Sequence, residues 1–253
     1  MFRGKTISLV IPAYNEEVTI TSVVEEFRSN SLLDEILVVD NKCTDRTAEL
    51  ARAAGARVIS ETLPGYGQAL RAGMDAAKGD ILVLTEADGS FRARDVDKLL
   101  IYLEDASMIM GTRTTKQMVE QGANMRGALR WGNVFMAKFL QLLFMHPHGP
   151  RFTDVGCSFR ALTSEAWRRM RDGTREPGPA FSPEMMCAAL LADCRVVEVP
   201  VTYSRRAGGE SKHSDTLGRQ AHTAWAMFKT ICRKRFTRQP VQKDVPVPVS
   251  PPQ

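Results

Sequence analysis

Thr6-Ile-Ser-Leu-Val-Ile11 is a short apolar run that predicts a buried β-strand, and Pro12 predicts where that strand stops. Apolar residues then recur at helical spacing through residues 16–30, and a second buried run, Glu35-Ile-Leu-Val-Val39, ends in Asp40. The alternation continues with a helix predicted over 44–54, a strand over 56–60, a helix over 68–78 and a strand over 80–85. Strands that alternate with helices predict an α/β fold with a mainly parallel sheet and right-handed crossovers.

Two of these helices carry end signals. Thr44 is the predicted N-cap of the helix over 44–54, and Gly79 is the predicted C-cap of the helix over 68–78. The second half of the chain follows a looser pattern, which predicts strands over 107–111, 155–162 and 195–203 and helices over 126–145, 183–192 and 216–235.

The predicted organisation has three parts. We expect one α/β domain over residues 1–204, then a basic loop and an amphipathic helix over 205–238. From Gln239 onward the chain carries five prolines and little to bury, so we expect residues 239–253 to form a disordered tail.

Composition narrows the class of protein. The 253 residues suffice for one sizeable α/β domain, and 43% hydrophobic with 25% charged residues is the balance of a soluble globular protein. No apolar run reaches the roughly 20 residues that span a bilayer. No basic-then-apolar leader precedes the first strand, so we expect a cytoplasmic protein. The five cysteines form no CxxC pair, which favours free thiols over a zinc or redox motif.

The positive charge is concentrated near the C-terminus. Residues 205–238 hold nine Lys/Arg against Glu210 and Asp215, whereas residues 1–204 hold 24 Lys/Arg against 26 Asp/Glu. A nucleic acid, an anionic membrane surface or a phosphate-bearing substrate would be attracted to such a segment. A merely solvated basic helix would show the same pattern.

Polar and acidic side chains follow three of the predicted strands. The first strand is followed by Asn15 and Glu16, the second by Asp40 and Asn41, and the fourth by Glu86 and Asp88. One carboxylate after a strand is usually a helix cap, but the carboxyl ends of parallel strands meet at one edge of the sheet, where ligands bind. Two carboxylates separated by one residue can hold a hard divalent cation.

The sequence lacks the usual nucleotide-binding loops. The turn after the first strand, Pro12-Ala-Tyr-Asn-Glu16, contains no glycine, so it does not match the GxGxxG dinucleotide fingerprint. Gly65-Tyr-Gly67 stands later in the chain, at the start of a predicted helix. These glycines fit a flexible connection between strand and helix and a direct contact with a ligand equally well. No GxxxxGK[ST] motif is present, so hydride transfer and NTP hydrolysis are poorly supported.

Taken together, these motifs resemble those of family 2 glycosyltransferases with the GT-A fold. The matching segments are Val10-Ile-Pro-Ala-Tyr-Asn-Glu-Glu17, Val38-Val-Asp-Asn41, Thr44-Asp-Arg-Thr47, Gly65-Tyr-Gly-Gln-Ala-Leu70 and Thr85-Glu-Ala-Asp-Gly89. Further segments resemble the dolichol-phosphate mannose synthase and polyprenyl-phosphate glycosyltransferase branch. They are Gly111-Thr-Arg113, Asp154-Val-Gly-Cys-Ser-Phe-Arg160, Glu198-Val-Pro200 and Arg206-Ala-Gly-Gly-Glu-Ser-Lys212. The family usually has Asp-x-Asp followed by Gln or Asn, whereas this chain has Glu86 and Ser90 at the first and last of these positions.

The resemblance implies a donor site with a Mg²⁺ or Mn²⁺ ion. It implies that Asp88 ligates the metal and that Glu86 faces the ribose or a metal-bound water. The other residues implied to bind the nucleotide sugar are Pro12, Tyr14, Glu16, Asp40 and Gly67. Arg206 and Lys212, separated by a Gly-Gly hinge, would close over the phosphates, since Arg supplies a bidentate fork and Lys a point charge. Solvated surface charge is the alternative for both.

The resemblance also implies an acceptor that is a polyprenyl phosphate. A phosphate monoester is largely dianionic at neutral pH, so it needs positive groups that position it more than it needs a general base. We expect Arg113, Arg126 and Arg160 to hold this phosphate, and Asp154 to orient the acceptor or the sugar. A plain turn carboxylate is the alternative for Asp154.

The last predicted helix combines Trp225 and Phe228 on one stripe with a basic flank, as an interfacial membrane helix would. An ordinary core-packing helix is the alternative. The chain is therefore expected to be an inverting, metal-dependent glycosyltransferase that uses a polyprenyl phosphate at the cytoplasmic face of the membrane. Nucleic acid is not an expected partner, and a homo-oligomer is left open. A hydroxyl acceptor, a sugar nucleotidyltransferase and a non-catalytic nucleotide-binding adaptor are the alternatives.

Overall fold

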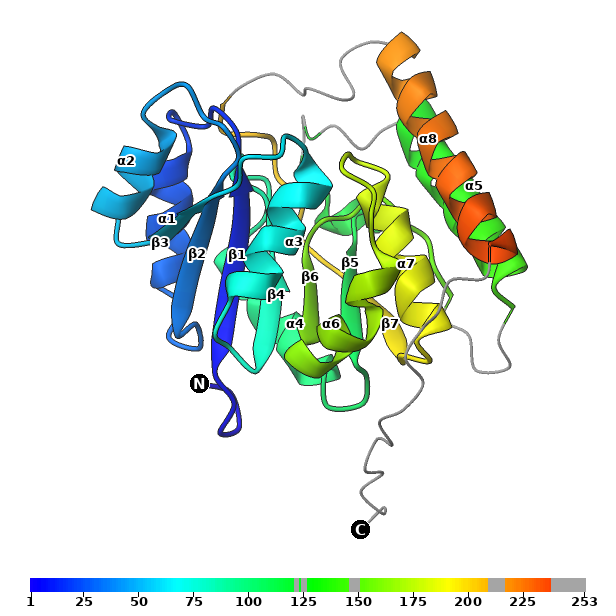
Figure 1. The fold of residues 1–253 in the computed structure, drawn as a ribbon, viewed down its shortest axis with the longest axis horizontal. Helices are drawn as coiled ribbons and strands as arrows, with labels where there is room; N and C mark the ends of the chain where they lie inside the picture. Colours follow the sequence, from blue (N-terminus) through cyan, green and yellow to red (C-terminus); the bar gives the residue numbers. More distant parts are fainter. Residues whose placement is uncertain (121–122, 124–126, 146–150, 209–216, 238–253) are drawn as a thin grey trace.

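The computed structural model describes residues 1–120, 123, 127–145, 151–208 and 217–237, and Figure 1 shows their arrangement. The strands are β1 (Ile7–Ala13), β2 (Glu35–Asp40), β3 (Arg57–Ser60), β4 (Ile81–Leu84), β5 (Met108–Thr112), β6 (Arg160–Thr163) and β7 (Val196–Pro200). The helices are α1 (Ile20–Arg28), α2 (Thr47–Ala53), α3 (Tyr66–Ala76), α4 (Val96–Tyr102), α5 (Gly127–Leu143), α6 (Ser164–Met170), α7 (Phe181–Leu191) and α8 (Leu217–Phe236).

The strands form one seven-stranded sheet in the order β3-β2-β1-β4-β6-β5-β7. Only β6 runs antiparallel to its neighbours β4 and β5, so the predicted mainly parallel α/β sheet is confirmed. The central order β2-β1-β4 brings the carboxyl ends of these three strands side by side, and the site described below lies there.

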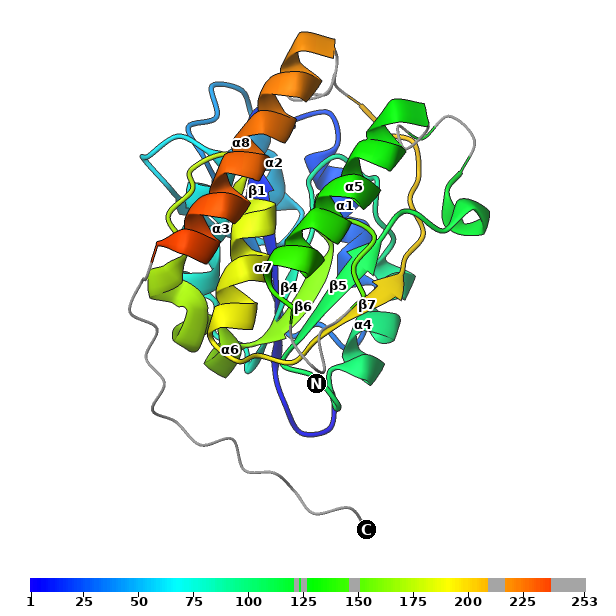
Figure 2. The ribbon, with the colours of Figure 1, turned by 90° about the vertical axis from the view of Figure 1, so that its right-hand side faces the viewer.

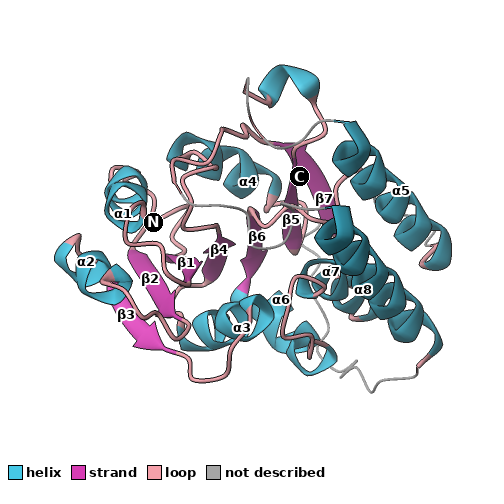
Figure 3. Cartoon of the chain, turned by 90° about the horizontal axis from the view of Figure 1, so that it is seen from above, coloured by secondary structure: helices cyan, strands magenta, loops and turns pink. Residues whose placement is uncertain are grey.

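Helices cover both faces of the sheet. Side chains alternate along β1, so that Ile7, Leu9 and Ile11 face a core shared with α1, α2 and α4. Val10 faces the opposite core, which is built with α3, α5, α6, α7 and α8. Figure 3 shows α1, α2 and α4 on one side of the strands and α3 and α6 on the other. Figure 2 shows α5 and α8 on the outside of the molecule, next to α7.

Pro12 does not end the first strand, contrary to the expectation from sequence. It lies inside β1, opposite Val39 of β2, and the strand continues to Ala13. The pairing of β1 with β4 reaches only as far as Val10. At Pro12 the strand therefore has a neighbour on one side only, and such an edge-like position tolerates a residue without an N–H group.

The two predicted helix caps are also wrong. Helix α2 begins at Thr47, and it is Asp45 Oδ1, not Thr44, that accepts the Thr47 N–H at 3.0 Å. Helix α3 ends at Ala76, before Gly79. A Cβ on Gly79 would lie 2.5 Å from the Ser8 nitrogen, so this glycine permits a close approach of two backbone segments.

The second half departs further from the sequence pattern. The strand predicted over 155–162 begins only at Arg160, because the residues before it form a loop. Helices α4 and α6 were not predicted. Helix α8 packs one side on the body of the protein, where Ile231 is fully buried, and leaves Trp225 and Phe236 exposed. No helix in the described part of the chain is both long and apolar enough to cross a bilayer. The tail predicted over 239–253 lies outside the described residues.

Candidate active site

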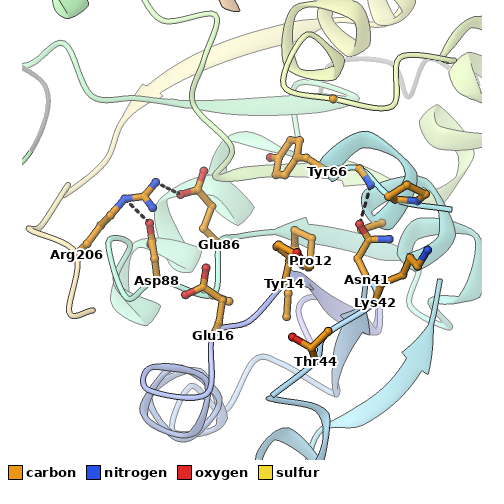
Figure 4. A pocket seen from close by; sticks show the side chains of 16 residues that line it. Pro12, Tyr14, Glu16, Asn41, Lys42, Thr44, Tyr66, Glu86, Asp88 and Arg206 are labelled. Atoms are coloured by element: carbon orange, nitrogen blue, oxygen red, sulfur yellow. Dashed lines mark hydrogen bonds and ion pairs between the residues drawn. The ribbon is translucent and has the colours of Figure 1, made fainter. Parts of the chain in front are cut away.

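A cavity of about 760 Å³ opens at the carboxyl ends of β1, β2 and β4 (Figure 4). Its wall comes from the turns after these strands, from the start of α3, and from two residues distant in sequence. The lining residues are Pro12, Ala13, Tyr14, Glu16, Asn41, Lys42, Thr44, Pro64, Gly65, Tyr66, Ala69, Glu86, Ala87, Asp88, Gly178 and Arg206. The structure therefore gathers six of the predicted donor-site residues, namely Pro12, Tyr14, Glu16, Glu86, Asp88 and Arg206.

One side of the cavity is fixed by an asparagine. Asn41 Nδ2 donates hydrogen bonds to the carbonyls of Glu61 and Leu63, and its Oδ1 accepts one from Gly65 N–H at 2.8 Å. Asn41 thus fixes the loop before α3 as a wall of the cavity. Lys42 beside it has a φ of 64°, in the left-handed region, which costs a non-glycine residue about 1 kcal/mol or more.

Two predicted donor residues support the cavity from behind instead of lining it. Gly67 N–H donates to the Pro177 carbonyl at 2.7 Å, and a Cβ at Gly67 would lie 2.1 Å from the Glu176 carbonyl oxygen. Gly67 is needed for this close packing, which corrects its predicted contact with the nucleotide sugar. Asp40 Oδ1 accepts the Cys43 N–H at 2.8 Å and so shapes the turn after β2.

The other end of the cavity is charged. Arg206 Nε lies 3.0 Å from Asp88 Oδ2, and Arg206 Nη2 lies 3.7 Å from Glu86 Oε2 (Figure 4). Ser158 Oγ donates to Glu86 Oε1 at 2.7 Å. Burial, together with the charge of Asp88, raises the pKa of Glu86 to about 7 despite the opposing effect of Arg206. This end of the cavity holds two carboxylates and one guanidinium within contact of each other.

These carboxylates fit a divalent cation that is shared with a ligand. Asp88 is 3% exposed and its Oδ2, although next to Arg206, accepts no hydrogen bond. Ser90 Oγ, at the position where the family has an amide, is also buried without a hydrogen-bond partner. No group of three or more His, Cys, Asp or Glu side chains in the described residues is arranged to hold a metal. Glu86 and Asp88 would therefore hold Mg²⁺ or Mn²⁺ only with oxygens of a bound diphosphate and water completing the shell.

Arg113 and Asp154 bind each other. Arg113 Nε and Nη2 donate to the two carboxylate oxygens of Asp154 at 2.8 and 2.9 Å, and Asp154 is fully buried. Burial acts to raise the pKa of Asp154, but the charge and hydrogen bonds of Arg113 lower it below its ordinary value. Glu198 in turn accepts the amides of Thr153 and Asp154. The predicted acceptor residues Arg113 and Asp154 thus form a fixed ion pair with each other.

Arg160 is not available to a phosphate, which corrects its predicted role. Its side chain is buried, and Nε, Nη1 and Nη2 donate to the carbonyls of Cys157, Ser182 and Val155. Burial lowers the pKa of Arg160 from its ordinary value. The guanidinium therefore joins β6 to α7 inside the protein. Arg126 and Lys212, also predicted to bind phosphates, lie outside the described residues.

Several residues of the site were missed by the sequence reasoning. Tyr66 lies between the two glycines of Gly65-Tyr-Gly67. Only the glycines of this motif suggested a ligand contact, whereas it is the tyrosine, with Gly65, that lines the cavity. Lys42 and Thr44 follow β2 directly, so the rule that ligands bind at strand ends could have found them. Ser158 lies in the segment 154–160 that carries the resemblance, but its contact with Glu86 was not predicted, and no local signal marks Gly178.

Comparison with known proteins agrees with this geometry. The model of the family "Glycosyl transferase family 2" matches residues 8–164. An uncharacterised glycosyltransferase of Mycobacterium tuberculosis is 33% identical over 214 residues, which are 85% of this chain and 92% of that protein. A dolichyl-phosphate hexose transferase of Haloferax volcanii is 30% identical over 205 residues, which are 80% of this chain and 84% of that protein.

The fold matches solved structures as well. The structure of glucosyl-3-phosphoglycerate synthase from Mycobacterium tuberculosis with Mn²⁺, UDP and glucosyl-3-phosphoglycerate superposes with a TM-score of 0.70 at 24% identity, covering 93% of this chain and 82% of that one. The same enzyme with UDP-glucose and phosphoglyceric acid gives a TM-score of 0.71 at 23% identity, with the same coverage. The predicted GT-A fold is confirmed, and the chain belongs to glycosyl transferase family 2.

Proposed function

We propose that this glycosyltransferase moves a sugar from a nucleotide-sugar donor, GDP-mannose or a UDP-hexose, to a polyprenyl phosphate, with inversion at the anomeric carbon. The observation that carries the proposal is the two-ended cavity. Pro12, Tyr14 and Tyr66 offer flat apolar surface at one part of it, and Glu86, Asp88 and Arg206 form the charged end. A nucleoside with its diphosphate has the same division into a flat ring and a charged group.

The charged end suits departure of a nucleoside diphosphate. In the transfer, an acceptor phosphate oxygen forms a bond to the anomeric carbon while the bond from that carbon to the diphosphate oxygen breaks, and the electron pair leaves with the nucleoside diphosphate. Arg206 lies where its guanidinium can stabilise this developing charge. A divalent cation held by Asp88 and Glu86 would supply further positive charge at the diphosphate. A dianionic acceptor needs no proton removed, so no general base is required.

The choice of acceptor is supported by a relative. The Haloferax volcanii protein, whose name gives dolichyl phosphate as its substrate, is similar over 80% of this chain. The solved neighbour holds phosphoglyceric acid, which is also a phosphorylated molecule. For this chain we propose the lipid phosphate as acceptor and, with it, peripheral association with the cytoplasmic face of a membrane. The alternative is a hydroxyl acceptor, as in other family 2 enzymes.

The test is a transfer assay with purified full-length protein. GDP-mannose, UDP-glucose and other nucleotide sugars are incubated with polyprenyl phosphate and Mn²⁺ or Mg²⁺, and the lipid-phosphate sugar is detected by mass spectrometry. We expect one donor to give product, and Asp88→Asn to lower the rate about a hundredfold or more by removing a carboxylate charge from the cation. Asp105→Asn, an exposed aspartate away from the cavity, is the matched control.

Three outcomes would contradict the proposal. Transfer to phosphoglycerate or to a sugar hydroxyl, but not to a polyprenyl phosphate, would replace the acceptor. Undiminished activity in excess EDTA, or in Asp88→Asn, would remove the metal-assisted part. No nucleoside diphosphate release with any donor and acceptor would favour the non-catalytic alternative.

A further inference from the structure

Exposed apolar side chains gather on one pair of helices. Half of the twelve large hydrophobic residues that are exposed in the described part of the chain lie on α5 and α8 or directly follow α5. These six are Trp131, Phe135, Leu142, Met145, Trp225 and Phe236. Trp131, Phe135 and Leu142, which are 70%, 66% and 65% exposed, are spaced so that they share one side of α5, with Lys138 between them. We call Trp131, Phe135, Leu142 and Met145 the α5 ridge.

The two helices form one continuous face of the molecule. Figure 2 shows α5 and α8 side by side on the outside. Phe139 of α5 stacks on Phe228 of α8 with ring centroids 4.8 Å apart, and Arg235 Nε donates to the Leu143 carbonyl at 2.8 Å. Figure 1 shows that both helices reach the end of the molecule where the strands have their carboxyl ends. The α5 ridge is thus fixed on the same body as the cavity.

The charge that α5 and α8 themselves contribute to this face has one sign. Neither α5 nor α8 contains Asp or Glu anywhere in its sequence. Lys138 and Lys229 are exposed beside the apolar residues, and Lys229 Nζ lies 5.3 Å from the centre of the Trp225 ring. Apolar side chains flanked by lysines, with tryptophan among them, suit the boundary between lipid headgroups and acyl chains.

We propose that the face made by α5 and α8 docks on an anionic lipid bilayer, with the α5 ridge inserted between the headgroups. This inference rests on the proposed function, since a polyprenyl phosphate acceptor resides in a bilayer. The expectation drawn from the sequence had Trp225, Phe228 and the basic flank of the last helix make this contact, whereas here the α5 ridge supplies most of the exposed apolar surface and Phe228 stacks on Phe139. Lys234 is buried against Glu184 at 2.9 Å, and the half-exposed Arg233 pairs with Glu176, so these two charges of the last helix are balanced by carboxylates of the protein.

A second copy of the chain fits this face less well than a bilayer. Two copies meeting through α5 and α8 would bring Lys138 and Lys229 of both copies together, with no carboxylate from either helix between them. An anionic surface instead complements these lysines, and its interior accepts the ridge. The apolar and the charged residues of the face therefore both favour an anionic bilayer.

The test is flotation of the full-length protein with vesicles of phosphatidylcholine that contain about one-third phosphatidylglycerol, and with vesicles of phosphatidylcholine alone. We expect the wild type to float with the anionic vesicles. The double variant Trp131→Ala/Phe135→Ala should bind them at least about tenfold more weakly, because it loses two inserted aromatic side chains. Ile101→Ala/Tyr102→Ala is the matched control, since these exposed residues lie on α4.

Fluorescence gives a second reading. Trp167 is 3% exposed, whereas Trp131 and Trp225 are 70% and 56% exposed. Insertion should shift the emission of the wild type to shorter wavelength on vesicle addition. Trp131→Phe should keep most of the binding and lose much of the shift, because Phe retains the apolar ring and Trp131 supplies the signal.

The outcomes separate docking from chemistry. If Trp131→Ala/Phe135→Ala floats as well as the wild type, the α5 ridge does not insert and the inference is wrong. If the wild type does not float but is a dimer that this variant converts to monomer, the face is an interface between copies, which also overturns it. Transfer to a short, water-soluble polyprenyl phosphate is measured in parallel. Transfer without flotation would support the proposed function and contradict the docking surface. Flotation without any transfer would contradict the proposed function and support the docking surface.

Discussion

Glu86 owes its position to a residue that is remote in sequence. Ser158 Oγ donates to Glu86 Oε1, and Ser158 is only 3% exposed, so the donor is fixed inside the protein. The longer side chain of Glu86, compared with the usual aspartate of the family, reaches this serine while its other oxygen lies near Arg206. The hydroxyl thereby holds the carboxylate in one orientation at the charged end of the cavity.

We predict that Ser158→Ala lowers kcat/KM roughly tenfold without a large loss of stability, because Glu86 loses the hydrogen bond that orients it and that helps to lower its pKa. Initial rates and thermal unfolding measure the two effects. Ser204→Ala is the matched control, because Ser204 is also buried and its hydroxyl has no hydrogen-bond partner. Equal activity of the two variants would show that the hydrogen bond to Glu86 has no role in the reaction.

Arg160 is expected to matter for stability instead of acceptor binding. Arg160→Met leaves the carbonyls of Cys157, Ser182 and Val155 without their side-chain donor, and we predict a loss of about 3 kcal/mol in the free energy of unfolding. Urea unfolding checks this value, with Arg168→Met, an exposed arginine on α6, as the control. A variant as stable as the wild type but with a raised KM for the acceptor would restore the phosphate-binding role predicted from sequence.

At the scale of the elements, Glu198 joins β7 to the loop before β6. Its carboxylate accepts the amides of Thr153 and Asp154, and so fixes the loop that carries the partner of Arg113. Burial raises the pKa of Glu198 to about 7, although the hydrogen bonds from Thr153 and Asp154 act to lower it. The folded protein therefore keeps a proton on Glu198 at pH values where the unfolded chain has released it.

We predict a dependence of stability on pH from this group. An unfolded glutamate titrates near pH 4.3. The contribution of Glu198 is therefore fully present below that pH, and it is lost as the pH rises to about 7. The decline should amount to roughly 3 kcal/mol. Glu198→Gln should flatten this part of the profile when unfolding is compared at about pH 5 and pH 7.5, whereas Glu25→Gln, at an exposed site, should not. Parallel profiles for the wild type and Glu198→Gln would contradict the assignment.

The elements also show what a sequence pattern can predict. Buried parallel strands such as β2 and β4 read as continuous apolar runs, and their order in the chain is enough to place Glu86 and Asp88 at a ligand-binding edge. Burial of a charged side chain cannot be recognised from such a pattern in the sequence. The residues around Arg160 are typical of a strand, and this pattern would be the same if the arginine faced solvent and not three carbonyls. The contact of Ser158 with Glu86 joins residues 72 positions apart. These features depend on tertiary packing, which local periodicity does not encode.

At the scale of the whole molecule, α8 is connected to the cavity. Thr230 Oγ1 donates to Glu176 Oε1 at 3.0 Å, and Arg233 pairs with the same carboxylate. The next residue, Pro177, accepts the Gly67 N–H at the start of α3, and Gly178 lines the cavity. The loop that carries Glu176 is thus fixed on one side by α8 and on the other by the helix that forms a cavity wall.

We predict that Glu176→Ala raises the KM for the nucleotide sugar roughly three- to tenfold while kcat changes little, since the variant loosens a wall of the cavity but leaves the charged end intact. Initial rates at varied donor concentration, with calorimetric binding of the nucleoside diphosphate, measure the effect. Arg235→Ala is the control, because Arg235 lies on the same helix but donates to the Leu143 carbonyl, away from this loop. Thr230→Val should give a smaller change in the same direction, because Arg233 still holds Glu176. If Glu176→Ala binds the donor as the wild type does, then the cavity does not depend on α8, and the helix only packs on the core and forms the outer face with α5.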